Sequence, residues 1–320
     1  MKTNNILYLF PDEVRDLFLY VSEYESKLQE IRLRIENPVY VKIAGEEFFL
    51  DRQGKPIHTE ALARKLNAEE VKRIINHICK YSIYAYEDEL RQGFLTVPGG
   101  HRVGVVGQVV LNEKGEIRTI KHISAMNIRI AHQVRGAADK VLPYMYQGGK
   151  MKNTIIVSPP GCGKTTLLRD MIRQVSDGNA FGQGMNVGVV DERSEIAGCF
   201  HGSPQNDVGI RTDILDRCPK GKGMMLLIRS MAPEVVAIDE LGEEEEWRML
   251  QYASYCGISI LATMHGEGWE DYRKRKNLCQ HDNKDIFSLC IVMRRNLGKC
   301  EVTHIYEKNH KEEWECILQK

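Results

Sequence analysis

The chain has 320 residues, 42% of them hydrophobic and 28% charged, a composition typical of a globular protein large enough for two domains. Its 44 basic and 44 acidic residues cancel, so bulk charge does not favour binding to nucleic acid or to an anionic membrane. Nine cysteines without a Cys-x-x-Cys pair argue against a disulfide framework and a structural zinc site, and favour reduced thiols in a cytoplasm. No apolar run reaches the ~18 residues of a membrane-spanning helix.

Residues 1–140 read as an N-terminal α+β domain. Residues 39–43 predict a strand, and residues 67–92 predict a helical stretch in which Asn67 and Glu70 fit an N-terminal capping box. Residues 93–110 and 117–130 have the alternation of β-structure. An earlier helix is predicted within residues 11–35 from apolar residues at helical spacing: Val14, Leu17, Phe18, Val21, Leu28 and Ile31.

Residues 141–320 alternate strands and helices and predict an α/β domain with a parallel core and a β-rich tail. The run Glu243–Glu246 reads as a solvated helix start, where negative charge suits the helix dipole. Buried strands are predicted at residues 154–157, 187–190, 235–238 and 258–262, because these apolar runs lack polar alternation. Later strands are expected at residues 287–293, 302–306 and 314–318.

The most specific chemical signal lies between the first of these strands and the next helix. In that setting, a glycine-containing turn ending in Gly-Lys-Thr is typical of a phosphate-binding loop, or P-loop. Its backbone N–H groups face the phosphates of ATP, Lys164 reaches the β- and γ-phosphates, and the Thr165 hydroxyl binds Mg²⁺. The residues expected to bind the nucleotide are Ser158, Pro159, Pro160, Gly161, Cys162, Gly163, Lys164, Thr165 and Thr166.

Two positions in this loop stand out. Ser158 replaces the first glycine of the standard pattern, which is acceptable where φ is negative. Cys162 lies inside the turn, so its oxidation or alkylation is expected to block ATP binding.

Two later strands each end in a pair of carboxylates. After residues 235–238, Asp239 is expected to hold the Mg²⁺ shell and Glu240 to orient and polarise the attacking water. After residues 187–190, Asp191 is a further Mg²⁺ candidate and Glu192 a further catalytic candidate, because the carboxyl ends of parallel strands face one crevice. The sequence leaves open which of Asp191, Glu192 and Glu240 activates water.

A fourth strand end carries Thr263 and His265, and His265 is placed to sense the γ-phosphate by hydrogen bonding. The order of these four elements resembles the secretion ATPase superfamily, the hexameric motors of type II and type IV secretion and of pili. More closely, the chain resembles the stage III sporulation protein AA family over most of residues 30–306. The resemblance is most specific at residues 190–199, and it extends to residues 94–104, 127–131, 165–170 and 228–235.

This resemblance implies a RecA-like P-loop NTPase core that carries a smaller N-terminal α+β domain, binds ATP and Mg²⁺, and forms a homohexamer. It also implies a cytoplasmic protein of the mother cell in an endospore-forming bacterium. That protein would dock on the membrane-anchored channel proteins that link mother cell and forespore. In the superfamily, N-terminal arginines reach the nucleotide across a domain or subunit boundary, and Arg102 and Arg129 fit that role. Further candidates are Arg193, Arg229, Arg294 and Arg295.

Two other functions use the same core. A nucleic-acid-dependent P-loop ATPase of the helicase or recombinase type is the main alternative. Zero net charge and the lack of interleaved aromatic and basic residues argue against it. A small-molecule kinase would need an acceptor pocket and a lid, and residues 268–284 are the only lid-like stretch.

Overall fold

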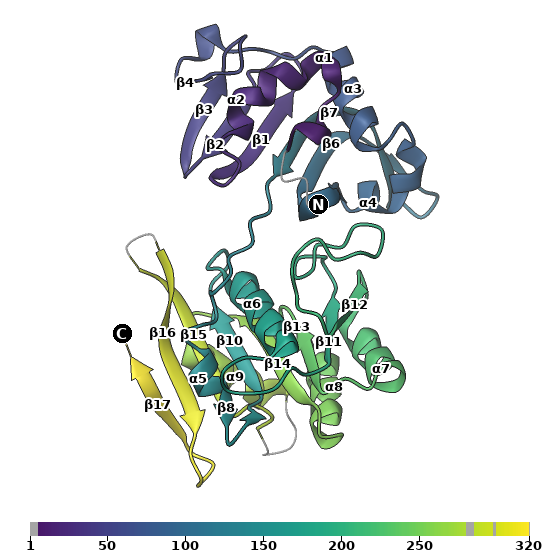
Figure 1. The fold of residues 1–320 in the computed structure, drawn as a ribbon. Coiled ribbons are helices and arrows are strands. Elements are labelled where there is room, and N and C mark those ends of the chain that lie inside the picture. The colour runs from purple at the N-terminus through teal and green to yellow at the C-terminus, as the bar shows by residue number, and fades with distance from the viewer. Residues whose placement is uncertain (1–5, 280–284, 297–298, 320) are drawn as a thin grey trace. The chain divides into compact units, whose positions relative to one another are not determined.

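The computed structural model describes residues 6–279, 285–296 and 299–319. The chain forms two compact units, Met1–His132 and Gln133–Lys320 (Figure 1). Residues 133–140, which the sequence pattern places in the first domain, group with the second unit. Within the described ranges, no helix is long and apolar enough to cross a bilayer.

The first unit is built on a seven-stranded sheet in the order β4-β3-β2-β1-β7-β6-β5, with antiparallel pairing throughout. The strands are β1 (Leu28–Arg34), β2 (Tyr40–Ile43), β3 (Glu46–Leu50), β4 (Pro56–Ile57), β5 (Phe94–Thr96), β6 (Arg102–Leu111) and β7 (Ile117–Arg129). The helices are α1 (Asp12–Arg15), α2 (Leu19–Ser22), α3 (Ala68–Ile78) and α4 (Glu87–Arg91).

One face of this sheet forms the core of the unit, because alternate side chains of a strand point to the same face. Ile31 of β1 lies opposite Val41 of β2 and Ile128 of β7, and all three are fully buried. The apolar side of α3 packs into the same core through Val71 and Ile74. The other face of the sheet carries both polar and apolar side chains, among them Arg32, Tyr40 and Phe49.

The predicted capping box of α3 is confirmed. The amide of Glu70 donates to Asn67 Oδ1, and the amide of Asn67 donates to Glu70 Oε2, each at 2.9 Å. The helix ends at Ile78, so the helical stretch predicted over residues 67–92 is divided between α3 and α4.

The helix predicted within residues 11–35 is only partly correct. Helical structure ends at Ser22, and Leu28–Arg34 is strand β1. A bulge between Leu28 and Glu30 shifts the strand's alternation, which makes its apolar residues imitate helical spacing. Because β1 lies between β2 and β7, pairing with two neighbours decides its structure.

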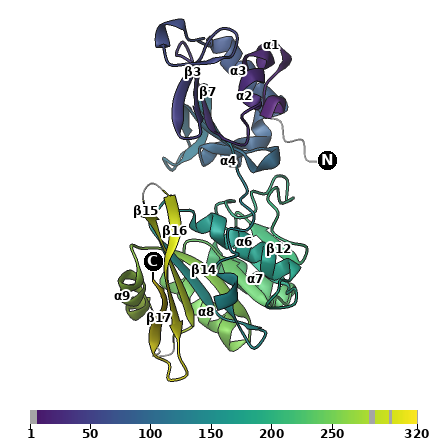
Figure 2. The same ribbon diagram turned by 60° about the vertical axis from the view of Figure 1, so that its left-hand side comes forward.

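The second unit contains an eight-stranded sheet in the order β12-β11-β13-β14-β10-β15-β16-β17. The first six strands of this order, from β12 at one edge to β15, pair in parallel. Strands β16 and β17 extend the sheet beyond β15 in antiparallel fashion (Figure 2). The strands are β10 (Thr154–Ser158), β11 (Val187–Asp191), β12 (Thr212–Asp216), β13 (Val235–Ile238), β14 (Ser259–His265), β15 (Leu289–Asn296), β16 (Lys299–Lys308) and β17 (Trp314–Gln319). A separate hairpin pairs β8 (Tyr146–Gln147) with β9 (Lys150–Met151).

Helices cover both faces of this sheet. On one face, α6 packs Leu168 and Met171 against strand residues such as Ile156. On the other, α8 packs Trp247 against strand residues such as Val157. The helices are α5 (Leu142–Met145), α6 (Lys164–Asp177), α7 (Lys220–Ser230), α8 (Glu244–Tyr255) and α9 (Trp269–Cys279). The predicted parallel α/β core with a β-rich tail is therefore confirmed, whereas β12 and α7 were not predicted.

The acidic run at Glu243–Glu246 begins α8 as predicted, but its last member is not solvated. Glu246 is only 6% exposed. It accepts hydrogen bonds from the amides of Gly242 at 2.7 Å and Glu243 at 3.0 Å, and it pairs with Lys220 at 3.0 Å. This carboxylate caps the helix from inside the protein.

The stretch considered as a lid is largely a packed helix. Tyr272 of α9 is fully buried and donates to Asp285 Oδ1 at 2.5 Å. Residues 280–284 of the stretch lie outside the described residues. The described part of residues 268–284 is thus fixed to the sheet.

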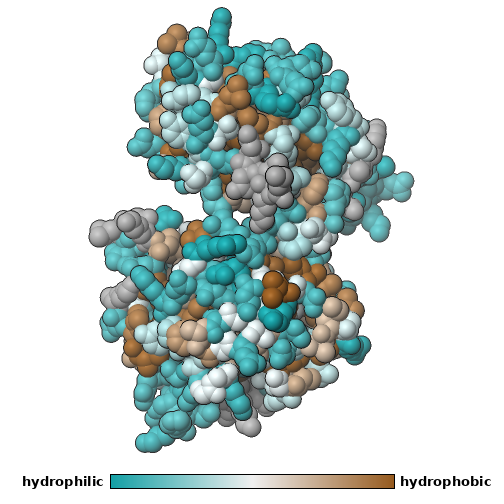
Figure 3. All heavy atoms as spheres, in the orientation of Figure 1, coloured by the Kyte–Doolittle hydropathy of each residue, from teal (hydrophilic) through white to brown (hydrophobic). Residues whose placement is uncertain are grey.

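The surface of each unit mixes polar and apolar groups. Figure 3 shows mostly hydrophilic side chains on the visible face, with apolar groups scattered between them. In the first unit, β6 and β7 expose several large apolar side chains, namely Val106, Val109, Leu111 and Ile117.

Candidate nucleotide-binding site

The turn between β10 and α6 has the backbone of a P-loop. Gly161 has φ 69° and Gly163 has φ 83°, the left-handed region that favours glycine. Gly163 is the N-cap of α6, and among the described residues no side chain caps the helix there. The first N–H groups of α6 are therefore available to an anion, and helix N-termini of this kind bind phosphate.

Ser158 fits its position in this loop. It is the last residue of β10, is fully buried, and does not belong to the described residues with positive φ. Its hydroxyl donates to the carbonyl of Pro159 at 2.8 Å. The departure from the standard pattern therefore introduces no left-handed serine.

Three sequence-predicted residues meet beside the loop. Lys164 Nζ donates to Glu240 Oε1 at 3.1 Å and lies 3.3 Å from both ring nitrogens of His265. His265 Nε2 lies 2.8 Å from the same carboxylate oxygen. The strand order explains this meeting, because β14 lies between β10 and β13 and so brings His265 between Lys164 and Glu240.

The charges of this cluster hold Glu240 in its ionised form. Burial alone would raise the pKa of Glu240, but the Lys164 ammonium, with His265 and Arg193, lowers it below the usual range. Arg193 Nη1 binds the second carboxylate oxygen at 2.6 Å.

Asp239 joins the P-loop helix to the neighbouring strands. Thr165 Oγ1 donates to Asp239 Oδ2 at 2.8 Å, and the Thr263 hydroxyl donates to Asp239 Oδ1. The hydroxyl of Thr165 and the carboxylate of Asp239 are the hard oxygen ligands that suit Mg²⁺. Within the described ranges no group of three His, Cys, Asp or Glu side chains forms a metal site, so phosphate and water oxygens would complete the coordination.

Asp191 is used differently from the Mg²⁺ ligand that the sequence suggested. It is 1% exposed, and both its oxygens accept hydrogen bonds from the loop that follows it. The amide of Glu195 donates to Oδ1 at 2.8 Å, and the amides of Ile196 and Ala197 donate to Oδ2 at 3.0 and 2.8 Å. Burial raises the pKa of Asp191, whereas these N–H donors act in the opposite direction. Its carboxylate shapes the loop.

Glu192 lines a small pocket together with Asp239 and Glu240, as the sequence predicted for neighbouring strand ends, but its charge is used elsewhere. Its carboxylate pairs with Lys220 Nζ at 2.9 Å, and Lys220 also binds Glu246. Burial alone would lower the pKa of Lys220, but the two carboxylates raise it overall. Sequence reasoning missed Lys220. Its signal is a lysine at the first residue of a helix, where the dipole disfavours positive charge unless carboxylates compensate.

Arg169 of α6 is a second residue that the sequence analysis did not single out. Its buried guanidinium donates to the carbonyls of Ile196 and Glu195, each at 2.6 Å. Asp191 binds the N–H groups of the same loop, so the loop is held from both sides. This clamp fixes the backbone that carries Glu192 and Arg193.

Arg102 and Arg129 lie together in the first unit. They are directly opposite each other on β6 and β7, and Glu30 of β1 continues the row on the far side of Arg129. The Arg102 guanidinium also lies over the ring of Phe94, 4.3 Å from its centroid. Both arginines thus lie on the face of the sheet opposite the core of the unit.

The further candidate arginines are dispersed over the second unit. Arg193 binds Glu240, as described above. Arg294 Nε donates to the carbonyl of Glu267 at 2.9 Å, just beyond the end of β14. Arg295 pairs with Cys300 in the β15–β16 ladder, and Arg229 is exposed near the end of α7. Among these four arginines, and within the part of the chain that the structure describes, Arg193 is the one that forms an ion pair with the Lys164 cluster.

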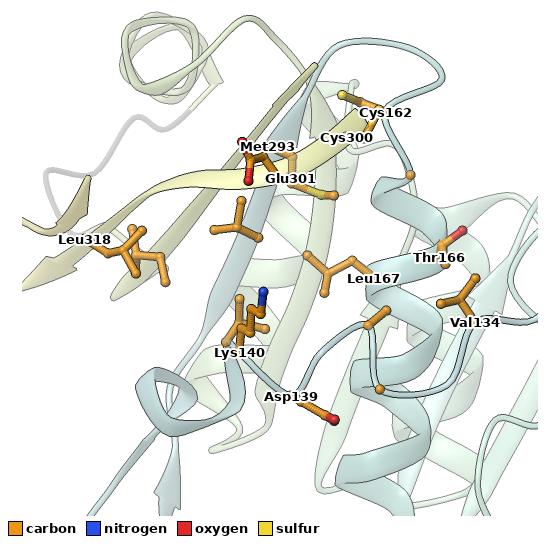
Figure 4. Close-up of a pocket in the computed structure, with 16 residues that line it drawn as sticks. Val134, Asp139, Lys140, Cys162, Thr166, Leu167, Met293, Cys300, Glu301 and Leu318 are labelled. Carbon is orange, nitrogen blue, oxygen red and sulfur yellow. The ribbon is translucent and has the colours of Figure 1, made fainter. Parts of the chain in front are cut away.

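A cavity of about 520 Å³ opens beside the P-loop (Figure 4). Cys162, Thr166 and Leu167 form one wall, residues 134–141 form another, and the β-rich tail closes the third through side chains such as Met293. Most of the lining side chains are apolar. No sequence motif indicates this cavity, because its walls come from three distant segments.

Comparisons with known proteins agree with this geometry. The model of the family described as "Sporulation stage III, protein AA" matches residues 1–312. Stage III sporulation protein AA of Bacillus subtilis (strain 168) is 38% identical over 307 residues, which cover 96% of this chain and 95% of that protein.

Solved structures show the same fold. The Legionella pneumophila ATPase DotB has a TM-score of 0.59 at 15% identity, covering 94% of this chain and 83% of that one. The pilus retraction motor PilT, solved with bound ADP, has a TM-score of 0.61 at 15% identity, covering 95% and 83%. The P-loop NTPase fold with an N-terminal domain is therefore confirmed.

Proposed function

Because this chain belongs to the sporulation stage III, protein AA family, we propose that it is an ATP-hydrolysing motor or assembly ATPase of endospore formation. One observation carries the proposal: Lys164, Glu240 and His265 converge on a glycine turn whose helix N-terminus is free to receive phosphate. A phosphate-binding loop next to a carboxylate that can orient water is the arrangement required for phosphoryl transfer to water.

The nucleotide fits the site in one direction. Its phosphates lie at the turn and at Lys164, where N–H groups and an ammonium meet negative charge. Its base lies in the apolar cavity beside Cys162 and Leu167, which adjoins the same turn (Figure 4). Thr166 lines that cavity and is next to Thr165, so one helix end contacts both parts of the ligand.

Phosphate binding changes the state of Glu240. Lys164 neutralises Glu240 in the structure and must exchange this carboxylate for phosphate oxygens when ATP binds. The exchange removes a principal cause of the lowered pKa of Glu240 and so makes its carboxylate a better proton acceptor. His265 remains in contact with Glu240 and can report whether Lys164 has moved. Mg²⁺ held through Thr165 and Asp239 would supply charge neutralisation at the phosphates.

We extend the proposal to a ring of six copies. Arg102 and Arg129 lie on the sheet face opposite the core of the first unit. Arginines placed there could reach a nucleotide of the same or a neighbouring chain and offset transition-state charge. The family, together with the likeness to the motor PilT and the ATPase DotB, supports a mother-cell cytoplasmic ring docked on membrane-anchored channel proteins.

The first test measures nucleotide binding and phosphate release with Lys164→Ala. We expect hydrolysis to fall by about 100-fold or more, because a principal phosphate contact is lost. The matched control is Lys222→Ala, an exposed lysine of the same unit. Equal activity of Lys164→Ala and the control would contradict the ATPase proposal.

The second test measures mass in solution with a non-hydrolysable ATP analogue. A hexamer is expected, and Arg102→Ala is expected to reduce hydrolysis more than Arg34→Ala, an exposed arginine of β1. A fully active monomer would contradict the ring.

A further inference from the structure

Two cysteines meet at the edge of the cavity beside the P-loop. Cys162 lies inside the turn and Cys300 lies on β16, and Figure 4 shows their side chains next to each other. Cys300 Sγ lies 3.7 Å from the carbonyl oxygen of Gly161, the residue before Cys162. The two thiols also interact directly. Segments far apart in the chain thus bring two sulfur atoms together at the entrance for a ligand.

The two thiols differ in accessibility. Cys300 is exposed and lies opposite Arg295 in the β15–β16 ladder, so a cation adjoins it. Cys162 is 2% exposed, and burial raises its pKa to about 11, with Cys300 acting in the same direction. Attack on an external disulfide therefore starts at Cys300, because its sulfur is accessible to solvent and that of Cys162 is not.

The turn can accommodate a link to β16. Gly161 and Gly163 flank Cys162, and a Cβ added at either glycine would meet no atom within 4 Å. The backbone on both sides of Cys162 is therefore unconfined, and glycine leaves it free to adjust.

We propose that Cys162 and Cys300 are a redox modification site at which a reversible disulfide closes the nucleotide cavity. The closing effect rests on the proposed function, whereas the formation of the bond does not. A disulfide of this kind, in a protein otherwise rich in free thiols, would be regulatory rather than structural.

The reaction balances with a small-molecule disulfide such as oxidised glutathione. The Cys300 thiolate attacks one glutathione sulfur, which forms a mixed disulfide and releases one glutathione thiolate. The Cys162 thiol then loses its proton to solvent, attacks Cys300 Sγ and releases the second glutathione thiolate. The protein loses two electrons, and oxidised glutathione gains them. The second step is the slower, because Cys162 is buried.

The bond would act on both parts of the site. It would join the turn to β16 across the cavity that both cysteines line. It would also restrain the turn whose N–H groups face phosphate. Reduction by a dithiol would reopen the cavity, so the pair would couple ATP use to the thiol–disulfide balance.

The experiment uses the full chain, reduced or treated with oxidised glutathione. Peptide mapping by mass spectrometry without reduction identifies the bond, and a fluorescent ATP analogue reports binding. Cys300→Ser removes one partner, and Cys316→Ser is the matched control because Cys316 is an exposed cysteine on the adjacent strand β17.

We expect oxidised wild type and Cys316→Ser to yield the Cys162–Cys300 peptide and to bind the analogue about tenfold or more weakly than when reduced. Dithiothreitol is expected to restore binding. Cys300→Ser is expected to bind the analogue equally well with and without treatment by oxidised glutathione. A mixed disulfide that never resolves, another pairing, or a linked protein with undiminished binding would overturn the inference. If the reduced protein binds no nucleotide, the proposed function fails, while the linked peptide still decides whether the disulfide forms.

Discussion

The ends of β11 and β13 are nearly the same in sequence and differ in use. The two strands are parallel neighbours, and each leads into an Asp-Glu pair. Asp191 turns its oxygens to three amides of its own loop, and Glu192 pairs with Lys220. Asp239 instead accepts from Thr165 of the P-loop helix, and Glu240 accepts from Lys164. One pair supports the scaffold, while the other faces the P-loop.

The strand order explains the difference. Only β14 separates β13 from β10, the strand that carries the P-loop, whereas β11 lies one position farther away. The local backbone adds to this effect, because Glu240 has φ 54° and so turns the chain directly after Asp239. The position of an acidic strand end in the sheet therefore decides whether its carboxylates lie beside the P-loop. The same motif one strand away supports its own loop.

Asparagine at the two aspartates is expected to separate the two strand ends by their use of Mg²⁺. Asp239→Asn should raise the Mg²⁺ concentration needed for half-maximal hydrolysis by about 10–100-fold, because the carboxylate beside Thr165 is lost. Asp191→Asn is the matched control, since its oxygens bind backbone. Magnesium titrations of the ATPase rate measure both. Equal shifts for the two variants would remove the distinction between the strand ends.

Asp191→Asn should instead affect stability. Its amide nitrogen cannot accept from the N–H groups of residues 195–197, so at least one buried donor loses its partner. We expect the free energy of unfolding to fall by about 1–3 kcal/mol. Urea denaturation measures the change. Wild-type stability in this variant would show that the loop does not depend on the carboxylate.

The pH dependence of stability sharpens the account of Glu240. Because the folded pKa of Glu240 is lowered, the ionised carboxylate stabilises the folded state above the ordinary glutamate pKa of about 4.3. That contribution is lost as the pH falls through the lowered folded pKa. The stability advantage of wild type over Glu240→Gln should therefore shrink below about pH 4.3.

Thermal unfolding over a pH series tests this expectation, with Lys164→Met as the comparison background. In that background the stability advantage over Glu240→Gln should decrease less as the pH falls, because the Lys164 ammonium is a main cause of the lowered pKa of Glu240. An advantage that stays constant with pH would mean that the cation does not stabilise the carboxylate.

The smallest effect is expected at Arg193. Its side chain is 65% exposed although it binds Glu240 at 2.6 Å. Exposed ion pairs contribute about 0–1 kcal/mol, so Arg193→Gln should change the rate of hydrolysis by less than about fivefold. Steady-state phosphate release measures it. A loss of about 100-fold would instead place Arg193 among the groups that act on the phosphates.

The sequence predicts the parallel core well, because apolar runs without polar alternation identify β10, β11, β13 and β14. It predicts β1 poorly, since a bulge makes Leu28 and Ile31 imitate helical spacing. At the site, the P-loop pattern identifies Lys164 and Thr165. The directions of Asp191 and Glu192 depend on the loop backbone after β11, which no residue pattern specifies.

Contacts between distant segments are also beyond the sequence. Lys220 binds carboxylates from two other elements, and Cys300 meets the P-loop only because β16 joins the sheet next to β15. Arg169 clamps a loop that follows a different strand. Each of these depends on strand order, which the chain adopts only as a whole.

The most direct test of the central claim compares Glu240→Gln with Glu192→Gln in one assay of single-turnover ATP hydrolysis, with nucleotide binding measured in parallel. The account predicts that Glu240→Gln binds nucleotide and hydrolyses it about 10²–10⁴-fold more slowly, because the carboxylate next to Lys164 is removed. Glu192→Gln should stay within about fivefold of wild type, since it loses only a half-exposed ion pair with Lys220. The reverse order of the two rates would contradict the account.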